Sequence, residues 1–276
     1  AAHGTAVEQD RSTRAVCDRL GIELNELEDW SCCGASPARV GDGELIVRLG
    51  VRNLRIAERT GRDLLVPCAA CFANLETAAR RVRRREVPEG MEIPDRVPGV
   101  VPITRLLSNP EARARIAELR VGTLGRLNVA PYYGCLLVRP QELTQISDPD
   151  DPNEIDAVVQ ACGAKLVPWS YKTVCCGAGL SVTHPEIVAE SCSRLLDMAA
   201  RSGADCIVTA CPMCHANLDA QCWRIRRREK GGVDAVPVFY LTELVGLAPG
   251  VEGREDWFAR HLVDPRPLLA GLEGRS

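Results

Sequence analysis

Two groups of cysteines with the same internal spacing are the residues in this chain best suited to chemistry. Each group has a Cys-Cys-Gly triplet and a Cys-x-x-Cys pair, with thirty-four residues between the second cysteine of the triplet and the first cysteine of the pair. The second group repeats the first at a constant offset of 143 residues (175 minus 32). The two groups are Cys32, Cys33, Cys68 and Cys71, and Cys175, Cys176, Cys211 and Cys214. Four matches at one offset indicate an internal duplication with thiolate chemistry at its centre.

The cysteine content favours metal ligation over a disulfide framework. Fourteen cysteines could form disulfides in an oxidising compartment or bind metal in a reducing one. A chain of 276 residues that is 46% hydrophobic can bury a core without covalent links. Vicinal cysteine pairs also suit a disulfide framework poorly. We therefore expect metal ligands.

A fifth thiol in the second half, Cys135, narrows the kind of metal site. Thirty-nine residues separate it from Cys175. A structural zinc ion takes four ligands in a tetrahedron, and neighbouring side chains on an extended backbone point in opposite directions, so a Cys-Cys pair fits one small ion poorly. A multi-iron cluster can accept thiolates from separated directions. The residues favour an iron-sulfur site, and a thioredoxin-like redox pair or a zinc ribbon remains the alternative.

Several residues outside the two groups could be functional or structural. His215 follows Cys214 and could donate a proton or a hydrogen bond to cluster sulfur, or simply be structural, and Lys172 has the same standing. We expect Trp30 and Trp169 to pack beside the sites and restrict solvent. The cysteines expected to be buried as small apolar residues are Cys17, Cys162, Cys192, Cys206 and Cys222.

Short apolar runs alternate with helical patterns in both halves. The predicted strands are 63–66, 127–130, 165–168 and 205–209, and the predicted helices are 12–20, 44–59, 72–85, 153–162, 185–201 and 213–228. This alternation predicts an α/β fold with two pseudo-symmetric Rossmann-like lobes, each with a small parallel sheet flanked by helices. Ligands in such folds lie at strand carboxyl ends and helix N-termini, where the Cys-x-x-Cys pairs fall.

A segment rich in proline and glycine, residues 86–102, separates the repeats. We assign residues 1–110 to the first lobe and residues 111–276 to the second. The net charge of −3 gives no bias toward nucleic acid or an anionic membrane surface. Because no apolar run approaches eighteen residues and the first residues do not resemble a signal peptide, we expect a cytoplasmic protein without a membrane span.

The doubled cysteine pattern resembles the cysteine-rich CCG domain of the heterodisulfide reductase B subunit family. Other segments share the resemblance: Asp148-Pro-Asp-Asp-Pro152, Trp169-Ser-Tyr-Lys-Thr173, Pro237-Val-Phe-Tyr-Leu-Thr-Glu-Leu-Val-Gly-Leu247 and His261-Leu-Val-Asp-Pro-Arg-Pro-Leu268. The similarity covers essentially the whole chain. It is specific for the domain family and much less specific for the substrate.

The resemblance implies two noncubane 4Fe-4S clusters, each held by five cysteines, with a disulfide or thiol substrate bound between the lobes. The residues implied as ligands are Cys32, Cys33, Cys68, Cys71, Cys135, Cys175, Cys176, Cys211 and Cys214. It also implies two partners in a multi-subunit complex, one of them ferredoxin-like and the other flavin-containing. No catalytic residue beyond the clusters is implied.

The first half departs from this pattern because it has no cysteine in the place of Cys135. In the family the expected ligand would fall just before Ala1, so we expect that the sequence lacks its native N-terminus, with the first strand. If the first site instead has only four thiolates, it could hold an ordinary cubane cluster or zinc.

Two functions follow from the resemblance. The first is the disulfide-reducing subunit of a heterodisulfide reductase or a similar complex, which could also run in the oxidative direction. The second is an electron-transfer subunit of a larger dehydrogenase, of the succinate, lactate or glycolate type, in which no substrate touches the clusters.

Overall fold

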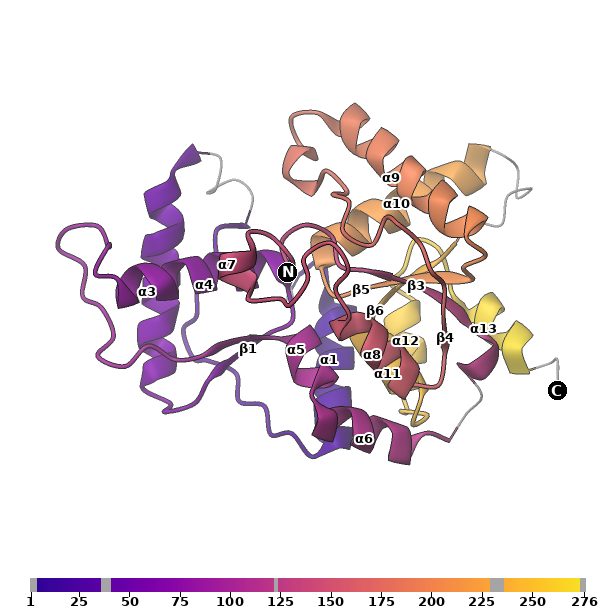
Figure 1. Cartoon of the computed structure of the whole chain (residues 1–276), viewed down its shortest axis with the longest axis horizontal. Helices are drawn as coiled ribbons and strands as arrows, with labels where there is room; N and C mark the ends of the chain where they lie inside the picture. The colour runs from indigo at the N-terminus through magenta and orange to yellow at the C-terminus, as the bar shows by residue number, and fades with distance from the viewer. Residues whose placement is uncertain (1–3, 36–40, 122–123, 229–235, 274–276) are drawn as a thin grey trace.

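The computed structural model describes residues 4–35, 41–121, 124–228 and 236–273 (Figure 1). It contains two parallel sheets flanked by helices, which confirms the predicted α/β class. Among the described residues the first sheet has two strands and the second has four. The strands are β1 (Leu64–Val66) and β2 (Val100–Pro102), and then β3 (Asn128–Tyr132), β4 (Lys165–Leu166), β5 (Cys206–Thr209) and β6 (Val238–Tyr240).

Helices connect the strands and cover the sheets. They are α1 (Val7–Leu20), α3 (Gly43–Glu58), α4 (Ala69–Arg83), α5 (Ile103–Ser108), α6 (Pro110–Leu119), α7 (Gln141–Thr144), α8 (Glu154–Ala161), α9 (Pro185–Arg201), α10 (Pro212–Arg228), α11 (Leu241–Leu247), α12 (Glu255–Phe258) and α13 (Arg266–Glu273). Two short 3-10 turns, η1 (Leu124–Arg126) and η2 (Ala178–Leu180), complete the described elements.

The four-stranded sheet has the order β4-β3-β5-β6, with every neighbouring pair parallel. All four residues of β5 are buried, as are the last four of β3. Apolar runs of this kind are what parallel strands covered on both faces require. Because β3 and β5 are paired and parallel, the turns that follow them lie at the same edge of the sheet. That edge receives the second cysteine group.

In the first half, α3 and α4 pack closely beside the two-stranded sheet. Asp42 caps α3 by accepting a hydrogen bond from the backbone N–H of Glu44 at 2.8 Å. The two helices meet at Gly50, where an added Cβ would lie 2.4 Å from the Cβ of Ala78. Glycine therefore permits this close approach, which brings α3 against the helix that begins at the first Cys-x-x-Cys pair.

Helices of the two halves pack against one another across their boundary. α1 packs against α11 and α12 of the second half, while α8 of the second half packs against α5 (Figure 1). A side-chain hydrogen bond lies at each contact. Ser12 on α1 bonds Thr242 on α11 at 2.7 Å, and Thr104 on α5 donates to Glu154 on α8 at 2.6 Å. The division at residue 110 stays a prediction, and these contacts tie the two halves together.

Most predicted elements are present with small shifts at their ends. Helix 185–201 is confirmed to the residue. Helix α1 begins five residues earlier than residue 12, and α4 includes the first turn after Cys68. The assignment of residues 86–102 wholly to a connection is wrong at its end, because Val100–Pro102 forms β2. The proline is tolerated there because it occupies the last position of a strand with one described neighbour.

Candidate metal centre

Cys135 and the second cysteine group, together called the second set, come from four places in the chain; the first cysteine group is likewise called the first set. Cys135 lies in the turn after β3, and Cys175 and Cys176 lie in the loop before η2. Cys211 follows β5, and Cys214 stands in the first turn of α10. The strand-to-helix turn predicted for the Cys-x-x-Cys pair is therefore confirmed.

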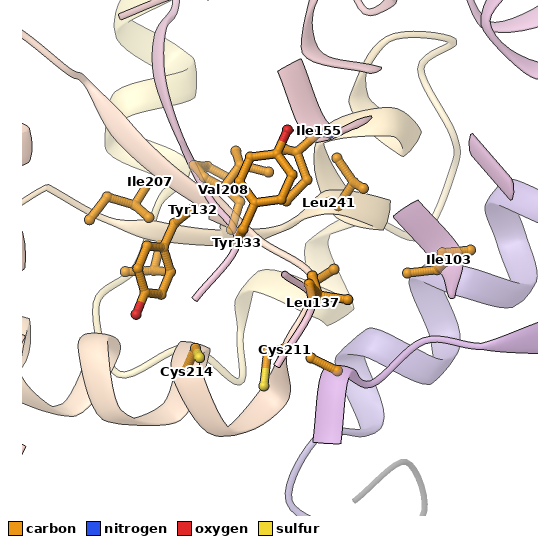
Figure 2. Close-up of a cluster of buried hydrophobic side chains, with 14 of the residues drawn as sticks. Ile103, Tyr132, Tyr133, Leu137, Ile155, Ile207, Val208, Cys211, Cys214 and Leu241 are labelled. Atoms are coloured by element: carbon orange, nitrogen blue, oxygen red, sulfur yellow. Dashed lines mark hydrogen bonds between the residues drawn. The ribbon is translucent and has the colours of Figure 1, made fainter. Parts of the chain in front are cut away.

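These five thiols lie against one another. The Sγ atoms of Cys176 and Cys214 are 3.5 Å apart. Cys214 also interacts with Cys211, and Cys135 interacts with Cys175. Figure 2 shows Cys211 and Cys214 at the helix start, below the buried side chains of the sheet. Folding thus collects thiols that are far apart in the sequence.

The pKa values in this set move in opposite directions, because each cysteine that is stabilised as a thiolate is hydrogen-bonded by a neighbouring thiol. They are lowered for Cys175, Cys176 and Cys211 and raised for Cys135 and Cys214. Hydrogen bonds from Cys214 and Cys68, together with the backbone N–H groups of Met213 and Cys214, hold the pKa of Cys211 well below 9.0 despite its burial. These N–H groups belong to the first turn of α10, where the helix carries a partial positive charge. At the other end of the group, a hydrogen bond from Cys135 lowers the pKa of Cys175 to about 6. Thiolate is the form that binds metal.

The first cysteine group repeats the inner part of this arrangement. Cys68 follows β1 and stands at the N-cap of α4, and Cys71 lies in the first turn of that helix. The Sγ atoms of Cys33 and Cys71 are 3.1 Å apart. Their hydrogen bond lowers the pKa of Cys33 and raises the pKa of Cys71 to about 12.

Two buried asparagines hold the loop that carries Cys33. The side-chain oxygen of Asn53 accepts the backbone N–H of Ser31 at 2.8 Å, and its amide donates to the Ser31 carbonyl at 2.8 Å. The amide of Asn74, on α4, donates to the carbonyl of Cys33 at 2.9 Å. The loop is therefore fixed from both α3 and α4, which restricts where the vicinal cysteines can lie.

The two groups meet at Cys68 and Cys211. The pKa of Cys68 is raised well above 9.0, first by a hydrogen bond with Cys211 and then by one with Cys71. Contacts between thiols therefore run in one mirrored row: Cys33, Cys71, Cys68, Cys211, Cys214, Cys176. The duplicated motifs form adjacent halves of one thiol-rich centre.

Glycine after each Cys-Cys pair adopts the left-handed conformation, which favours glycine because it has no Cβ. Gly34 has φ +85° and Gly177 has φ +79°. At Gly177 an added Cβ would also lie 3.4 Å from the Cα of Val188. Gly134 has φ +65°, and its Cβ position is 3.2 Å from the Sγ of Cys214. A larger residue would press directly on the thiol group.

Lys172 braces the turn that carries Cys135. Its Nζ donates to Asp156 at 2.9 Å and to Asp151 at 2.7 Å, and its carbonyl accepts the backbone N–H of Tyr133 at 2.8 Å. The hydroxyl of Tyr133 in turn donates to Asp156 at 2.5 Å. The structure therefore shows Lys172 bound within a structural network, where the sequence left a functional role open.

His215 is buried and faces β6. Its Nε2 is 3.0 Å from the carbonyl oxygen of Val238, and its ring stacks on Tyr240 with centroids 4.0 Å apart. Burial lowers the pKa of His215 well below 6.5. These contacts account for the histidine structurally, although it directly follows a thiol of the centre.

The expectations for the two tryptophans have different outcomes. Trp169 is buried, its Nε1 donates to the carbonyl of Pro131 at 3.0 Å, and it stacks with Tyr171. The expectation that Trp30 restricts solvent is wrong, because its side chain is 41% exposed and hydrogen-bonds the exposed Glu26. The burial predicted for the cysteines outside the groups is confirmed for Cys17, Cys162, Cys192, Cys206 and Cys222.

A buried polar cluster beside α10 was missed by the sequence reasoning. Glu243 is fully buried and bonds the Nε2 of His261 at 2.9 Å, and the Tyr240 hydroxyl lies 3.4 Å from Glu8. His215, Glu243 and His261 bring possible ligand atoms within 4.8 Å of one another. Glu243 and His261 lie in segments that carry the family resemblance, but no pattern in the sequence places them side by side. The Glu243 carboxylate also accepts the backbone N–H of Tyr240 at 2.8 Å at the start of α11.

The thiol centre fits an iron-sulfur group better than a single metal ion. Five thiols converge in the second set, one more than the four ligands of a structural zinc site. They approach from three backbone turns and a helix start, as ligands of a group several ångströms across would. Thioredoxin-like chemistry needs only the Cys-x-x-Cys pair and leaves the other contacts unexplained.

The family model of the cysteine-rich domain, CCG, matches residues 1–76 and 129–219, which contain both cysteine groups. The chain belongs to the cysteine-rich CCG domain family. The B subunit of the ferredoxin:CoB-CoM heterodisulfide reductase of Methanosarcina mazei is 31% identical over 95% of this chain and 91% of that protein. The resemblance to the heterodisulfide reductase B subunit family is thereby confirmed.

A second relative has a different name. The 8-methylmenaquinol:fumarate reductase membrane anchor subunit of Wolinella succinogenes is 30% identical over 95% of this chain and 94% of that protein. A crystal structure of a hypothetical protein from Helicobacter pylori has a TM-score of 0.71 at 14% identity. The match covers 95% of this chain and 50% of the Helicobacter chain, and it supports the fold alone.

Membrane spans can be assessed for the part of the chain that the structure describes. No helix there is both long and apolar enough to cross a bilayer.

Proposed function

We propose that this chain is the iron-sulfur subunit of a heterodisulfide reductase-type complex and reduces a disulfide, or forms one from thiols. The juxtaposition of the two cysteine groups carries the proposal: Gln9 hydrogen-bonds the carbonyls of Pro67 and Ala210, which directly precede Cys68 and Cys211, and these two thiols interact. The proposed cofactors are two noncubane 4Fe-4S clusters. When bound, they would supply one-electron chemistry, and two of them match the two electrons that a disulfide requires.

The chain's own residues would hold and shield these groups. The ligands would be the nine cysteines of the two sets, and the N–H groups at the start of α10 would favour the thiolate form of Cys211. Tyr132 closes the second set from the sheet side, where its hydroxyl donates to the carbonyl of Val174 at 2.7 Å. Burial raises the pKa of Tyr132 far above 10, so its phenol stays protonated and uncharged beside the thiolates.

A substrate would reach the centre from the side of the vicinal pairs. Cys32 and Cys175 are exposed, whereas Cys68 and Cys211 are buried. Exposed apolar side chains follow or precede Cys175 closely in the sequence: Val174, Leu180, Val182 and Ile187. This apolar border suits the uncharged part of a disulfide or the surface of another protein. Under this proposal two partner proteins complete the complex, one ferredoxin-like and the other flavin-containing.

A second function is favoured by the Wolinella relative, which is named as part of a fumarate reductase. Under that function the chain passes electrons within a larger dehydrogenase, and no substrate touches the clusters. The two functions share the iron-sulfur centre and differ in whether a disulfide reaches it.

Anaerobic cluster analysis with electron paramagnetic resonance (EPR) tests both functions. We expect about eight iron and eight sulfide per chain when both sets are loaded. If the first function holds, adding a disulfide to the reduced protein changes the EPR spectrum. An unchanged spectrum in a fully loaded protein supports the second function, and zinc alone after anaerobic purification excludes both.

The variant Cys175→Ser sharpens this experiment, because Cys175 is the exposed thiol of the second set. We expect it to abolish or alter the spectral response to the disulfide. Cys162→Ala is the matched control, since Cys162 is buried at the end of α8 and lies outside the two sets. Equal responses of the wild-type protein and Cys175→Ser would contradict a role of the second set in disulfide chemistry.

A further inference from the structure

One side chain is hydrogen-bonded to both cysteine segments. Gln9 lies on α1, is 4% exposed, and directs its amide nitrogen to two backbone carbonyls. Its Nε2 donates to the Pro67 carbonyl at 2.8 Å and to the Ala210 carbonyl at 3.1 Å. These are the residues immediately before Cys68 and Cys211. A primary amide nitrogen carries two N–H donors, so Gln9 can satisfy both carbonyls at once.

The second half of the chain holds α1 in this position. The hydroxyl of Ser12 bonds Thr242 on α11 at 2.7 Å, and Glu8 lies 3.4 Å from the Tyr240 hydroxyl. Both contacts flank Gln9 on the same helix. Helix α1 therefore precedes the first cysteine group in the sequence but docks on the second half, and from there Gln9 reaches both segments.

Gln9 has no counterpart in the duplication. The residue 143 positions later is Pro152, which has no side-chain donor and whose carbonyl instead accepts a hydrogen bond from Lys172 at 3.1 Å. The two hydrogen bonds of Gln9 therefore lie where the two cysteine segments meet, and the residue at the duplicated position cannot repeat them. Both bonds end one residue before Cys68 and Cys211, the two thiols through which the groups interact.

We propose that Gln9 is a positioning residue that sets the separation of Cys68 and Cys211 and thereby couples the two iron-sulfur sites. The proposal rests on the proposed function, in that both cysteine sets hold clusters. Electron transfer and magnetic interaction between two centres weaken steeply with distance. A fixed separation of Cys68 and Cys211 lets two one-electron sites act as one two-electron unit. Disulfide chemistry needs such a unit, whereas a simple electron relay does not.

The first test maps disulfides in the iron-free protein after limiting hydrogen peroxide. Two thiols lose two electrons and two protons as the S–S bond forms, and the peroxide leaves as two water molecules. The yield of the Cys68–Cys211 disulfide is measured by peptide mass spectrometry relative to that of Cys176–Cys214, whose sulfurs are 3.5 Å apart within one set. This internal reference corrects for the reactivity and accessibility of the thiols.

The decisive variants are Gln9→Met and Ser12→Ala. Methionine keeps the length of glutamine but donates no hydrogen bond, whereas Ser12→Ala weakens the docking of the same helix and leaves Gln9 in place. We expect Gln9→Met to lower the relative Cys68–Cys211 yield by about fivefold, the shift that loss of one buried hydrogen bond produces. We expect Ser12→Ala to leave it unchanged. An unchanged yield in Gln9→Met, or an equal fall in both variants, would overturn the proposal.

The second test uses the reconstituted protein. In the fully reduced wild type we expect EPR signals broadened by interaction between two clusters, and in Gln9→Met we expect the same iron content with weaker interaction. Gln9→Leu serves as a second variant should methionine impair folding, since leucine also donates no hydrogen bond. Full interaction in either folded variant contradicts the proposal. A lack of iron in the wild type contradicts the proposed function instead, and the disulfide map still decides whether Gln9 sets the thiol contact.

Discussion

In the second cysteine group the sulfurs of Cys176 and Cys214 lie 3.5 Å apart, and in the first group those of Cys33 and Cys71 lie 3.1 Å apart. The inner contacts of the two groups are therefore alike. They depend on a strand that ends in a helix whose first turn carries the second cysteine of a Cys-x-x-Cys pair. The duplication has kept that local geometry in both halves.

The outer parts of the two groups differ. Cys175 is hydrogen-bonded by Cys135, which a separate turn after β3 supplies. In the described part of the first half, the cysteine outside the group is Cys17, which is buried in α1 and whose pKa burial alone raises to about 11. The inner contact thus needs only the Cys-Cys-Gly loop and the strand-helix turn of one repeat, whereas the outer ligand requires an additional element.

The largest expected effect comes from removing the equivalent inner thiols. We expect Cys214→Ser and Cys71→Ser each to lower the bound iron by roughly half, because each disables one of two sites. Iron and sulfide analysis after anaerobic reconstitution measures this. Cys135→Ser should resemble Cys214→Ser. Loss of all iron in any one of these variants would show instead that the two groups load as one unit.

Sequence alone predicted the elements that local patterns determine. Helix α9 has a proline at its first position and a regular apolar stripe, so both of its ends could be placed. The turns that carry Cys68 and Cys211 followed from apolar strands that end at cysteines. The contact of Gln9 with both segments could not be predicted, because it depends on α1 docking on the second half. Strand β2 was missed because three residues that end in proline carry almost no strand signal.

The two sheets differ in how completely their strands are buried. Ile207 lies fully buried in β5, between two other strands, whereas Leu64 lies half-buried in the two-stranded sheet. We expect Ile207→Ala to lower the free energy of unfolding by about 2–5 kcal/mol and Leu64→Ala to lower it by less. Urea denaturation of the iron-free protein measures both. An equal loss would indicate that the smaller sheet is as well packed as the larger one.

The glycines after the cysteine pairs offer a smaller effect. Alanine at Gly34 or Gly177 places a side chain on a left-handed residue, which costs about 1–2 kcal/mol. At Gly177 the new Cβ would also press on Val188, so we expect the larger loss of stability and of iron in the second site. Thermal unfolding combined with iron analysis separates the two consequences. If Gly34→Ala proves the more damaging variant, the first loop is the tighter one.

The smallest effect concerns a segment that the two halves use differently. Thr104 and Arg105 are the second and third residues of α5, which follows β2, and Thr242 and Glu243 hold the same places in α11, which follows β6. Each charged residue is paired with an opposite charge, Glu154 for Arg105 and His261 for Glu243. The first pair is partly exposed and the second is buried. Only the second can therefore give a marked pH dependence in the neutral range.

Burial acts to lower the pKa of His261, but the hydrogen bond to Glu243 and the charges of Glu243, Asp219 and Glu8 outweigh it and raise that pKa above 6.5. A group whose pKa is raised by folding binds its proton more tightly in the folded state. Its stabilisation is therefore fully present below pH 6.5 and is lost as the pH rises through the folded value. We expect the stability difference between wild type and His261→Gln to be largest below about pH 6.5 and to shrink at higher pH, as urea denaturation at several pH values would show. The difference should stay constant with pH for Arg105→Gln, because arginine remains charged throughout this range. A constant difference for His261→Gln would mean that the buried pair is neutral in the folded protein and that the two halves are alike in this respect.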